Sequence, residues 1–217
     1  MHVLLEDNHL LAVQKPNGVL TQSDSSDRVS LHETAKEYLR TRYAKPGRVF
    51  LGIVHRLDRL ACGVVLFART SKSASRLSDQ IRRRTVRKRY WAVVEGCPSC
   101  IQTRLEGWLV RPGNRSKILK QPSPQAQACS LSYQVLRSES NRSLLEIDLE
   151  TGRKHQIRAQ MASIGHPVLG DKAYGAHSPF RPDGIALLAH RFEFDHPTRS
   201  ERIELVANIP ADWPIHP

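Results

Sequence analysis

A carboxylate stands beside an apolar run in the segment VHRLDRLACGVVLFART, residues 54–70. Asp58 precedes GVVLFA, residues 63–68, a run that is typical of a short strand buried on both faces. A carboxylate near the start of such a strand must be paired or functional. When ionised, it can act as a nucleophile or as a general base. Asp58 is therefore a candidate catalytic residue; the alternative is that it caps a turn and pairs with a neighbouring arginine.

A second candidate lies in the segment TGRKHQIR, residues 151–158. The spacing of Ile157 and Met161 predicts a helix, and Arg158 falls within its first two turns. Arg158 is the basic residue best placed to lean inward, where a guanidinium requires a carboxylate or a phosphate as its partner. The alternative is that Arg158 belongs to a solvated helix face.

Tyr90 is a third candidate because it begins the predicted strand YWAVVE, residues 90–95, directly after a basic run. An aromatic side chain on a nucleic-acid-binding surface can stack on an unpaired base. Packing in the core is the more common role of a strand aromatic, and it is the alternative here.

The charge of the chain indicates a polyanionic partner. Lys and Arg number 33 against 21 acidic residues, a formal net charge of +12. Nucleic acid is the usual partner of such a protein, and solubility is the alternative explanation. The charge is clustered, because six basic residues fall within eight positions: Arg82, Arg83, Arg84, Arg87, Lys88 and Arg89. This cluster predicts phosphate contacts that weaken with salt.

Several other chemistries have no motif in this chain. Cys97 and Cys100 have the spacing of zinc ligands, but no second pair accompanies them, and Cys62 and Cys129 are isolated. We therefore expect no metal. A glycine-rich phosphate loop and a G-x-S-x-G elbow are both missing, so we expect no cofactor.

The compartment is predicted from the same sequence. The segment 1–16 lacks the basic start of a secretory signal, and no run reaches the ~20 apolar residues of a membrane span. We expect no membrane partner and a cytoplasmic protein with reduced thiols.

Hairpins and short helices must position these residues. The apolar runs 3–5 and 10–13 predict a hairpin, followed by a turn at 15–18. The capping-box spacing of Ser30 and Glu33 predicts a helix to about residue 43. Further predictions are a helix capped by Ser71, with Ala74, Leu77 and Ile81 on its inner face, and a basic loop over 110–127 without helical or strand period.

The second half of the chain continues this pattern. Alternation predicts strands at 131–135 and 145–149, and the helix that carries Arg158 is expected to bury Ile157, Met161 and Ile164 and to stop at Gly165. A loop at 178–184 and strands at 187–194 and 202–207 complete the chain. No linker separates two cores, so we expect a single α+β domain over residues 1–217 with a largely antiparallel sheet.

These segments, in this order, resemble the RluA-type pseudouridine synthases. HRLDRLACG, residues 55–63, is similar to the HRLDxxTSG signature of the family, and KPNG, residues 15–18, is similar to its KPxG. KRYWAVVEG, residues 88–96, resembles K-x-Y-x-A-x-V-x-G, and residues 151–175 resemble the TGRxHQIR…GHPIxGDxxYG block nearly residue for residue. The chain departs from the family where Ala61 and Cys62 replace Thr-Ser, and where Leu188 replaces a common His.

The resemblance implies roles for the three candidates. It implies that Asp58 is the essential aspartate, Tyr90 the active-site tyrosine and Arg158 the arginine that pairs with the aspartate. It also implies a curved, mixed, mostly antiparallel sheet with flanking helices and a central basic cleft, and neither metal nor cofactor. Because KPNG begins at Lys15, we expect no N-terminal S4 domain, and we expect a monomer.

The implied activity is isomerisation of specific uridines to pseudouridine in structured RNA, ribosomal or transfer, after the uridine is flipped out of its stack. In addition to the basic cluster, the residues expected to contact the substrate are His55, Arg56, Leu57, Lys15, Arg153 and His155. Three alternatives are an RNA-binding protein without activity, a hydrolase that uses Asp58 with Asp171, and a DNA-binding module.

Overall fold

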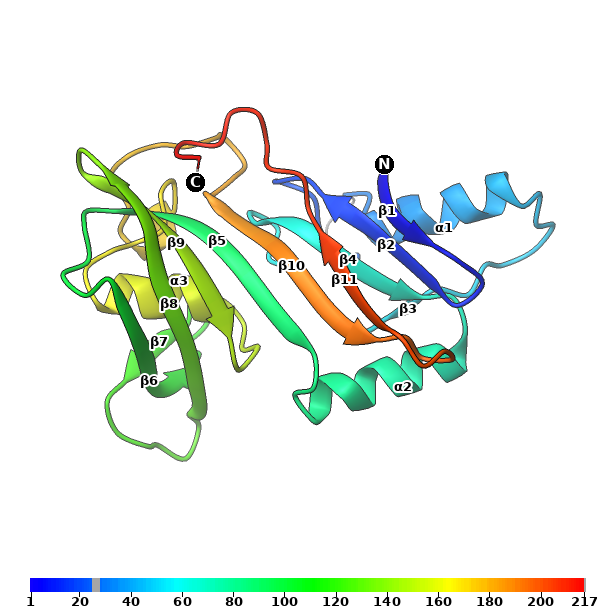
Figure 1. Ribbon diagram of the computed structural model, residues 1–217, viewed down its shortest axis with the longest axis horizontal. Helices are drawn as coiled ribbons and strands as arrows, with labels where there is room; N and C mark the ends of the chain where they lie inside the picture. Colours follow the sequence, from blue (N-terminus) through cyan, green and yellow to red (C-terminus); the bar gives the residue numbers. More distant parts are fainter. Residues whose placement is uncertain (25–27, 217) are drawn as a thin grey trace. The chain divides into compact units, whose positions relative to one another are not determined.

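The computed structural model describes residues 1–24 and 28–216 (Figure 1). The chain divides into two compact units, Met1–Val86 with Ala189–Asn208, and Arg87–Leu188 with Ile209–Pro217. We call them the first unit and the second unit. None of the helices in the described residues combines the length and apolar character needed to cross a bilayer.

The first unit is a mixed, mostly antiparallel sheet with two helices (Figure 1). Its elements are β1 (His2–Glu6), β2 (Leu10–Lys15), α1 (Leu31–Arg42), β3 (Gly52–Ile53), β4 (Cys62–Ala68), α2 (Ser71–Arg82), most of β10 (Leu187–Asp195) and β11 (Arg202–Val206). Strand β2 pairs with β1 and β4, β3 pairs with β4, and β11 pairs with β10, all antiparallel. The predicted hairpin of β1 and β2 is confirmed.

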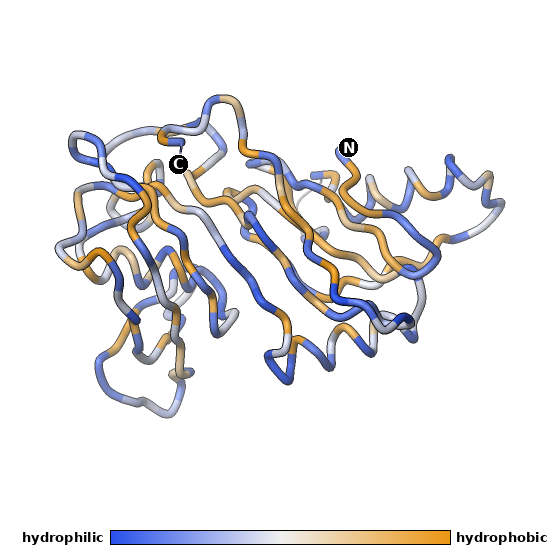
Figure 2. Tube along the Cα trace, in the orientation of Figure 1, coloured by the Kyte–Doolittle hydropathy of each residue, from blue (hydrophilic) through white to orange (hydrophobic). Residues whose placement is uncertain are grey.

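The centre of this sheet is apolar. Every residue of β4 is buried, and Leu10, Leu11, Ala12 and Val13 of β2 are inaccessible to solvent. Helix α2 lies against β3 and β4, and both helices alternate between hydrophobic and hydrophilic colour in Figure 2, as expected of helices with one buried face. The predicted buried strand at 63–68 is therefore confirmed.

Both helices begin at residues that accept a hydrogen bond. Ser30 and Glu33 form the predicted capping box of α1. The predicted cap of α2 at Ser71 is wrong by one residue, because Thr70 is the N-cap and its Oγ1 accepts from Ser73 N at 3.1 Å. Ser71 already has helical backbone, so the threonine before it is the residue whose side chain reaches the exposed N–H groups.

The second unit is a five-stranded antiparallel sheet with one α-helix. Its elements are β5 (Arg87–Glu95), β6 (Gln102–Val110), β7 (Lys117–Leu119), β8 (Gln127–Glu139), β9 (Arg142–Leu149), α3 (Gln156–Ser163) and the 3₁₀ helix η1 (Lys172–Tyr174). The strand order is β5-β9-β8-β6-β7, and α3 lies against β7 and η1. The predicted α+β class with a largely antiparallel sheet is confirmed.

Two predictions about this unit are wrong in part. The basic loop predicted at 110–127 contains β7, which pairs with β6 to form a hairpin, and β6 itself was not predicted. An edge strand of three residues is too short to show a period in the sequence. Ile164 is 36% exposed, because it lies just beyond the last turn of α3, whereas Ile157 and Met161 are buried as predicted.

Candidate active site

Asp58 lies in a loop whose main chain is held by hydrogen bonds from Thr21, Gly18 and Lys15. The loop, residues 54–61, runs from β3 to β4, and Asp58 is half-buried in it. Thr21 Oγ1 donates to the Leu57 carbonyl at 3.0 Å and accepts from Leu57 N at 3.2 Å. Gly18 N donates to the Arg59 carbonyl at 2.9 Å. The main chain on both sides of Asp58 is therefore fixed.

Lys15 supplies the third clamp. Its side chain is fully buried, and Nζ donates to the carbonyls of Pro16 at 2.9 Å, Val19 at 2.7 Å and Arg59 at 3.1 Å. Burial lowers the pKa of Lys15 to about 8. The predicted contact between Lys15 and the substrate is corrected, because a fully buried ammonium bonded to three carbonyls holds the Asp58 loop and does not face RNA.

Steric constraints explain why glycine occupies position 63, after the HRLD segment. Gly63 has φ of 119°, and a Cβ atom placed on it would overlap the carbonyl of Ala189 in β10. Only glycine lets the main chain of β4 approach β10 this closely, directly after the Asp58 loop.

The other members of the HRLD segment differ in exposure. His55 Nε2 accepts from Leu66 N at 2.9 Å, and its ring stacks on Phe192 with centroids 4.6 Å apart, so the imidazole packs within the first unit. The side chain of Leu57 is buried, and its main-chain N–H and carbonyl form the hydrogen bonds to Thr21. Arg56 is exposed at the edge of an open pocket of about 430 Å³ beside Gln22 and His32. The predicted substrate contacts of His55, Arg56 and Leu57 stay predictions, and of these three residues only Arg56 is exposed.

In the second unit, the partner of Arg158 is a buried carboxylate. Arg158 is 4% exposed and Asp171 is 0% exposed; Nε lies 2.6 Å from Oδ2, and Nη2 lies 2.9 Å from Oδ1. The guanidinium also lies 4.8 Å from the centre of the Tyr174 ring. The inward orientation predicted for Arg158 is confirmed, and its pairing with Asp58 stays a prediction. Sequence reasoning singled out Asp171 only as a second carboxylate for a hydrolase, a role that this buried ion pair does not suit.

A buried amide shapes the loop before α3. Gln156 Oε1 accepts from Thr151 Oγ1 at 2.8 Å and from Arg153 N at 3.0 Å, and Gln156 Nε2 donates to the Ser130 carbonyl at 3.0 Å. The residue before it, His155, has φ of 54°, an uncommon conformation outside glycine that tends to occur at functional sites. Sequence reasoning missed Gln156, although its place between Arg153 and Arg158 was the available signal.

Strand β5 brings Tyr90 and Lys88 to one face, since residues two apart share a side of a strand. Tyr90 is 9% exposed and lies opposite Ile147 of β9. Burial lowers the pKa of Lys88, and its Nζ lies about 4 Å from the position that a Cβ of Gly152 would occupy. Arg89 faces the other side, where its Nε lies 3.1 Å from Asp148 Oδ1. Lys88 and Tyr90 therefore lie on one face of β5, and Arg87 and Arg89 lie on the other.

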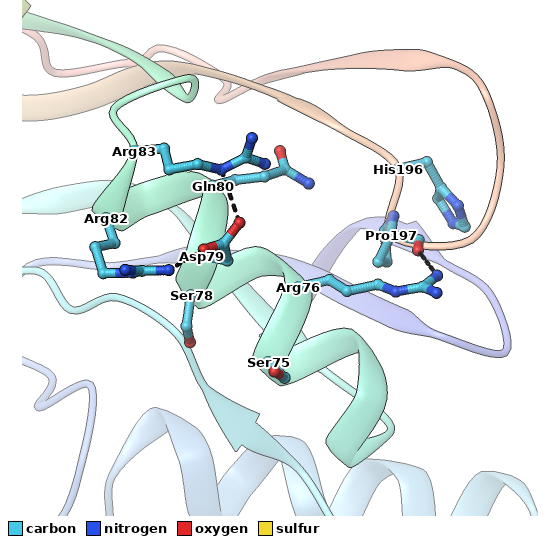
Figure 3. A pocket seen from close by; sticks show the side chains of 9 residues that line it. All are labelled: Ser75, Arg76, Ser78, Asp79, Gln80, Arg82, Arg83, His196 and Pro197. Carbon is cyan, nitrogen blue, oxygen red and sulfur yellow. Dashed lines mark hydrogen bonds and ion pairs between the residues drawn. The ribbon is translucent and has the colours of Figure 1, made fainter.

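The remaining arginines of the basic cluster are exposed. Arg82 and Arg83, at the end of α2, both pair with Asp79, beside an open pocket of about 670 Å³ that Arg76 and Pro197 also line (Figure 3). Arg84 and Arg87 are exposed as well.

Two of the residues predicted to contact the substrate, Arg153 and His155, lie in the loop before α3. Arg153 is half-exposed, with Nε 3.4 Å from the Ala128 carbonyl, and His155 Nδ1 lies 3.0 Å from Tyr174 Oη.

Among the described residues, no group of His, Cys, Asp and Glu side chains is arranged to hold a metal ion.

A family model and curated relatives show the family of this chain. Residues 9–163 match the family model described as RNA pseudouridylate synthase. The uncharacterized RNA pseudouridine synthase YhcT of Bacillus subtilis is 32% identical, over 98% of this chain and 70% of its own length. Ribosomal large subunit pseudouridine synthase D of Zymomonas mobilis is 31% identical, over 99% of this chain and 71% of its own length.

A solved structure shows the same fold. Human RNA pseudouridylate synthase domain containing 4 superposes with a TM-score of 0.81 at 23% identity, over 98% of this chain and 90% of the human one. The chain belongs to the RluA-type RNA pseudouridine synthases and is an isomerase that converts uridine to pseudouridine in RNA.

Proposed function

We propose that this enzyme isomerises specific uridines in structured ribosomal RNA, with Asp58 as its essential carboxylate and Tyr90 and Arg158 acting in the same reaction. The observation that carries this proposal is the clamped loop: Thr21, Gly18 and Lys15 fix the main chain on both sides of Asp58. A reacting group held in one geometry avoids the entropic cost of finding it during catalysis.

Asp58 supplies the chemistry that this reaction requires. The bond between N1 of the uracil base and C1′ of the ribose must break, and the base must turn and bond to C1′ through C5. C5 loses a proton and N1 gains one, so there is no net redox change. An ionised carboxylate can form a covalent intermediate and so divide one difficult step into two easier ones.

Arg158 is suited to support an ionised carboxylate. Its two hydrogen bonds to Asp171 engage one edge of the guanidinium, and the five N–H donors of an arginine allow more than one acceptor. A nearby guanidinium favours the charged form of a carboxylate. We propose that Arg158 serves Asp58 in this way, as the family resemblance implies.

Tyr90 and the basic residues would receive the RNA. Flipping a uridine out of its stack costs a few kcal/mol, and stacking on Tyr90 would return about 1–3 kcal/mol of it. Exposed arginines, including Arg56, Arg84 and Arg87, would bind flanking phosphates. Phosphate contacts position the RNA but do not specify its sequence.

The choice of RNA rests on the relatives. Ribosomal large subunit pseudouridine synthase D of Zymomonas mobilis is named for ribosomal RNA, which makes this the first substrate to test. Transfer RNA is the second. We propose that residues 1–217 act as one catalytic domain and as a monomer.

The test is release of tritium from RNA labelled at C5 of uridine, because the new bond forms at this carbon and displaces its hydrogen. Wild type, Asp58→Asn and Asp58→Ala would be compared on ribosomal and transfer RNA from a strain that lacks the protein, with Asp212→Asn as a control at an exposed aspartate. We expect release by wild type and the control alone, with a loss of at least ~10³-fold in both Asp58 variants.

Other results of this assay would support a different function for the protein. Normal release by Asp58→Asn would refute the role of Asp58. Binding of RNA without release from either pool would favour the RNA-binding protein without activity. Free uracil as a product would indicate hydrolysis, and equal affinity for duplex DNA would indicate a DNA-binding module.

A further inference from the structure

Tyr174 contacts three parts of the second unit at once. Its ring lies under the guanidinium of Arg158, 4.8 Å from Cζ. Its hydroxyl accepts from Ser116 N at 2.8 Å and lies 3.0 Å from Nδ1 of His155. Arg158 belongs to α3, His155 to the loop before it, and Ser116 to the turn between β6 and β7. One side chain therefore joins the candidate catalytic arginine to an element that is distant in sequence.

The chain around Asp171 explains why Tyr174 meets Arg158. Gly170 has φ of 84°, and a Cβ there would lie 2.8 Å from Cβ of Phe180, so the turn before Asp171 requires glycine. After Asp171, one turn of 3₁₀ helix follows, closed by Tyr174 N donating to the Asp171 carbonyl at 2.9 Å. This turn brings Tyr174 back beside the Asp171 side chain.

Asp171 and Tyr174 hold different parts of the same planar group. The carboxylate of Asp171 binds the guanidinium at its edge through Nε and Nη2, and the ring of Tyr174 lies against its face. A bidentate pair fixes the plane of an arginine, and a cation–π contact adds attraction along the normal to that plane. Together they leave Arg158 little freedom to rotate.

The third contact of Tyr174 leads to basic residues. Ser116 is 5% exposed, and besides its N–H bond to Tyr174 its Oγ donates to the Lys154 carbonyl at 2.7 Å. It ends the turn 111–116 of the β6–β7 hairpin, in which Arg111 and Arg115 are exposed, as is Lys117 at the start of β7. We call residues 110–119 the basic hairpin. Ser116 therefore connects this hairpin, through two hydrogen bonds, to the loop before α3 and to Tyr174.

We propose that Tyr174 is a positioning residue, which orients Arg158 for catalysis and fastens it to the basic hairpin through Ser116. This inference rests on the proposed role of Arg158. RNA phosphates bound by Arg111, Arg115 or Lys117 would hold the hairpin, and through Ser116 and Tyr174 they would hold the guanidinium in its working orientation. Loss of the Tyr174 hydroxyl would therefore slow the chemical step and leave RNA affinity in place.

The experiment separates the hydroxyl from the ring. Tyr174→Phe keeps the ring and removes the acceptor of Ser116 N, Tyr174→Leu removes both, and Ser116→Ala removes only the bond to Lys154. Tyr43→Phe is the matched control, because its hydroxyl bonds to Glu6 in the first unit. Each variant is measured for its single-turnover rate at saturating RNA, its Kd for RNA and its Tm.

We expect the single-turnover rate of Tyr174→Phe to fall about 2-fold to 10-fold, as for the loss of one or two hydrogen bonds, and that of Tyr174→Leu to fall further. The Kd should stay within 2-fold, and the control should match wild type. Since Ser116→Ala and Tyr174→Phe weaken the same fastening, their effects on the rate should be less than multiplicative in the double variant.

A rate unchanged in Tyr174→Phe would overturn the proposal. So would a loss that appears only in Kd, a rate loss accompanied by a large fall in Tm, or fully multiplicative effects in the double variant. Asp58→Asn on the same RNA keeps the two proposals apart: if it is inactive while Tyr174→Phe is normal, the function stands and only the role of Tyr174 fails. If Asp58→Asn is fully active, the proposed function fails whatever Tyr174 does.

Discussion

Thr21 holds both main-chain polar groups of Leu57 with a single hydroxyl. The N–H of Leu57 donates to Oγ1 at 3.2 Å, and Oγ1 donates to the Leu57 carbonyl at 3.0 Å. Both residues are buried, so these bonds form out of reach of solvent. Because Leu57 immediately precedes Asp58, the hydroxyl of Thr21 sets the main chain from which the candidate catalytic carboxylate projects.

Replacing Thr21 with Val removes this hydroxyl and keeps the shape of the side chain. It leaves the N–H and the carbonyl of Leu57 buried without their partner, which costs about 1–3 kcal/mol. We expect a fall of this size in the free energy of unfolding by urea, together with slower single turnover and unchanged RNA affinity. Thr41→Val, at an exposed position of α1, is the control; normal stability and rate in Thr21→Val would show that the clamp is dispensable.

The lowered pKa of Lys15 predicts how the stability of the protein depends on pH. Its pKa is about 8 in the folded protein and ~10.4 when unfolded, so between these values the unfolded chain binds more protons. The cost of burying the ammonium is fully present below pH 8 and is relieved as the pH rises. We therefore expect the free energy of unfolding of wild type, relative to Lys15→Met, to rise from pH 8 to pH 10 by up to ~1.4 kcal/mol per pH unit. Lys45→Met, at an exposed lysine, is the control, and a flat difference for Lys15→Met would contradict the lowered pKa of Lys15.

Arg158→Ala should affect both activity and stability. Turnover should be lost mostly in the chemical step, and Asp171 would be left as an unpaired buried carboxylate, which lowers the free energy of unfolding by about 3–5 kcal/mol. Arg40→Ala breaks an exposed pair with Glu37 and should leave the free energy of unfolding nearly unchanged. Single-turnover assays at low temperature, where the variant remains folded, separate the two effects. A change confined to RNA affinity would count against a role for Arg158 in the reaction.

Tyr90→Phe should bind RNA nearly as well as wild type, because the stacking face of the ring remains. Tyr90→Ala should weaken binding by about 1–3 kcal/mol. Filter binding with a substrate RNA measures both, and Tyr133→Phe, a core tyrosine of β8, controls for effects on folding. A large loss of binding in Tyr90→Phe would mean that the hydroxyl contributes more than the ring.

Asp79 pairs with two of the arginines that are predicted to contact RNA. It pairs with Arg82 and Arg83 at the end of α2, so a phosphate must displace it to bind them (Figure 3). We expect Asp79→Asn to tighten RNA binding on the order of 3-fold at low salt, and the gain to vanish near 1 M salt, where charges are screened within ~3 Å. Glu37→Gln on α1 removes a charge that pairs with Arg40, which is outside the basic cluster, and serves as the control. Unchanged affinity in Asp79→Asn at low salt would show that this surface does not contact RNA.

The elements that carry the candidate residues could be predicted from local patterns in the sequence. Apolar periodicity placed the hairpin of β1 and β2, the buried strand β4 and helix α3, and the spacing of Ser30 and Glu33 placed the start of α1. These signals are local, since they depend on residues within one turn or one strand. Residue type and position singled out Asp58, Tyr90 and Arg158, and the family resemblance implied their roles in the reaction, which stay predictions.

The contacts between side chains that are distant in sequence could not be predicted in this way. Lys15 was expected to contact RNA, yet it bonds to the carbonyl of Arg59, 44 positions away. Asp171 was singled out as a hydrolytic carboxylate, yet it grips Arg158, and no periodicity predicted that Ser116 would bond to Tyr174. A pattern along the chain shows which side chains point inward, but a buried polar group takes whichever partner packing brings within about 3 Å, and that choice is made across the fold.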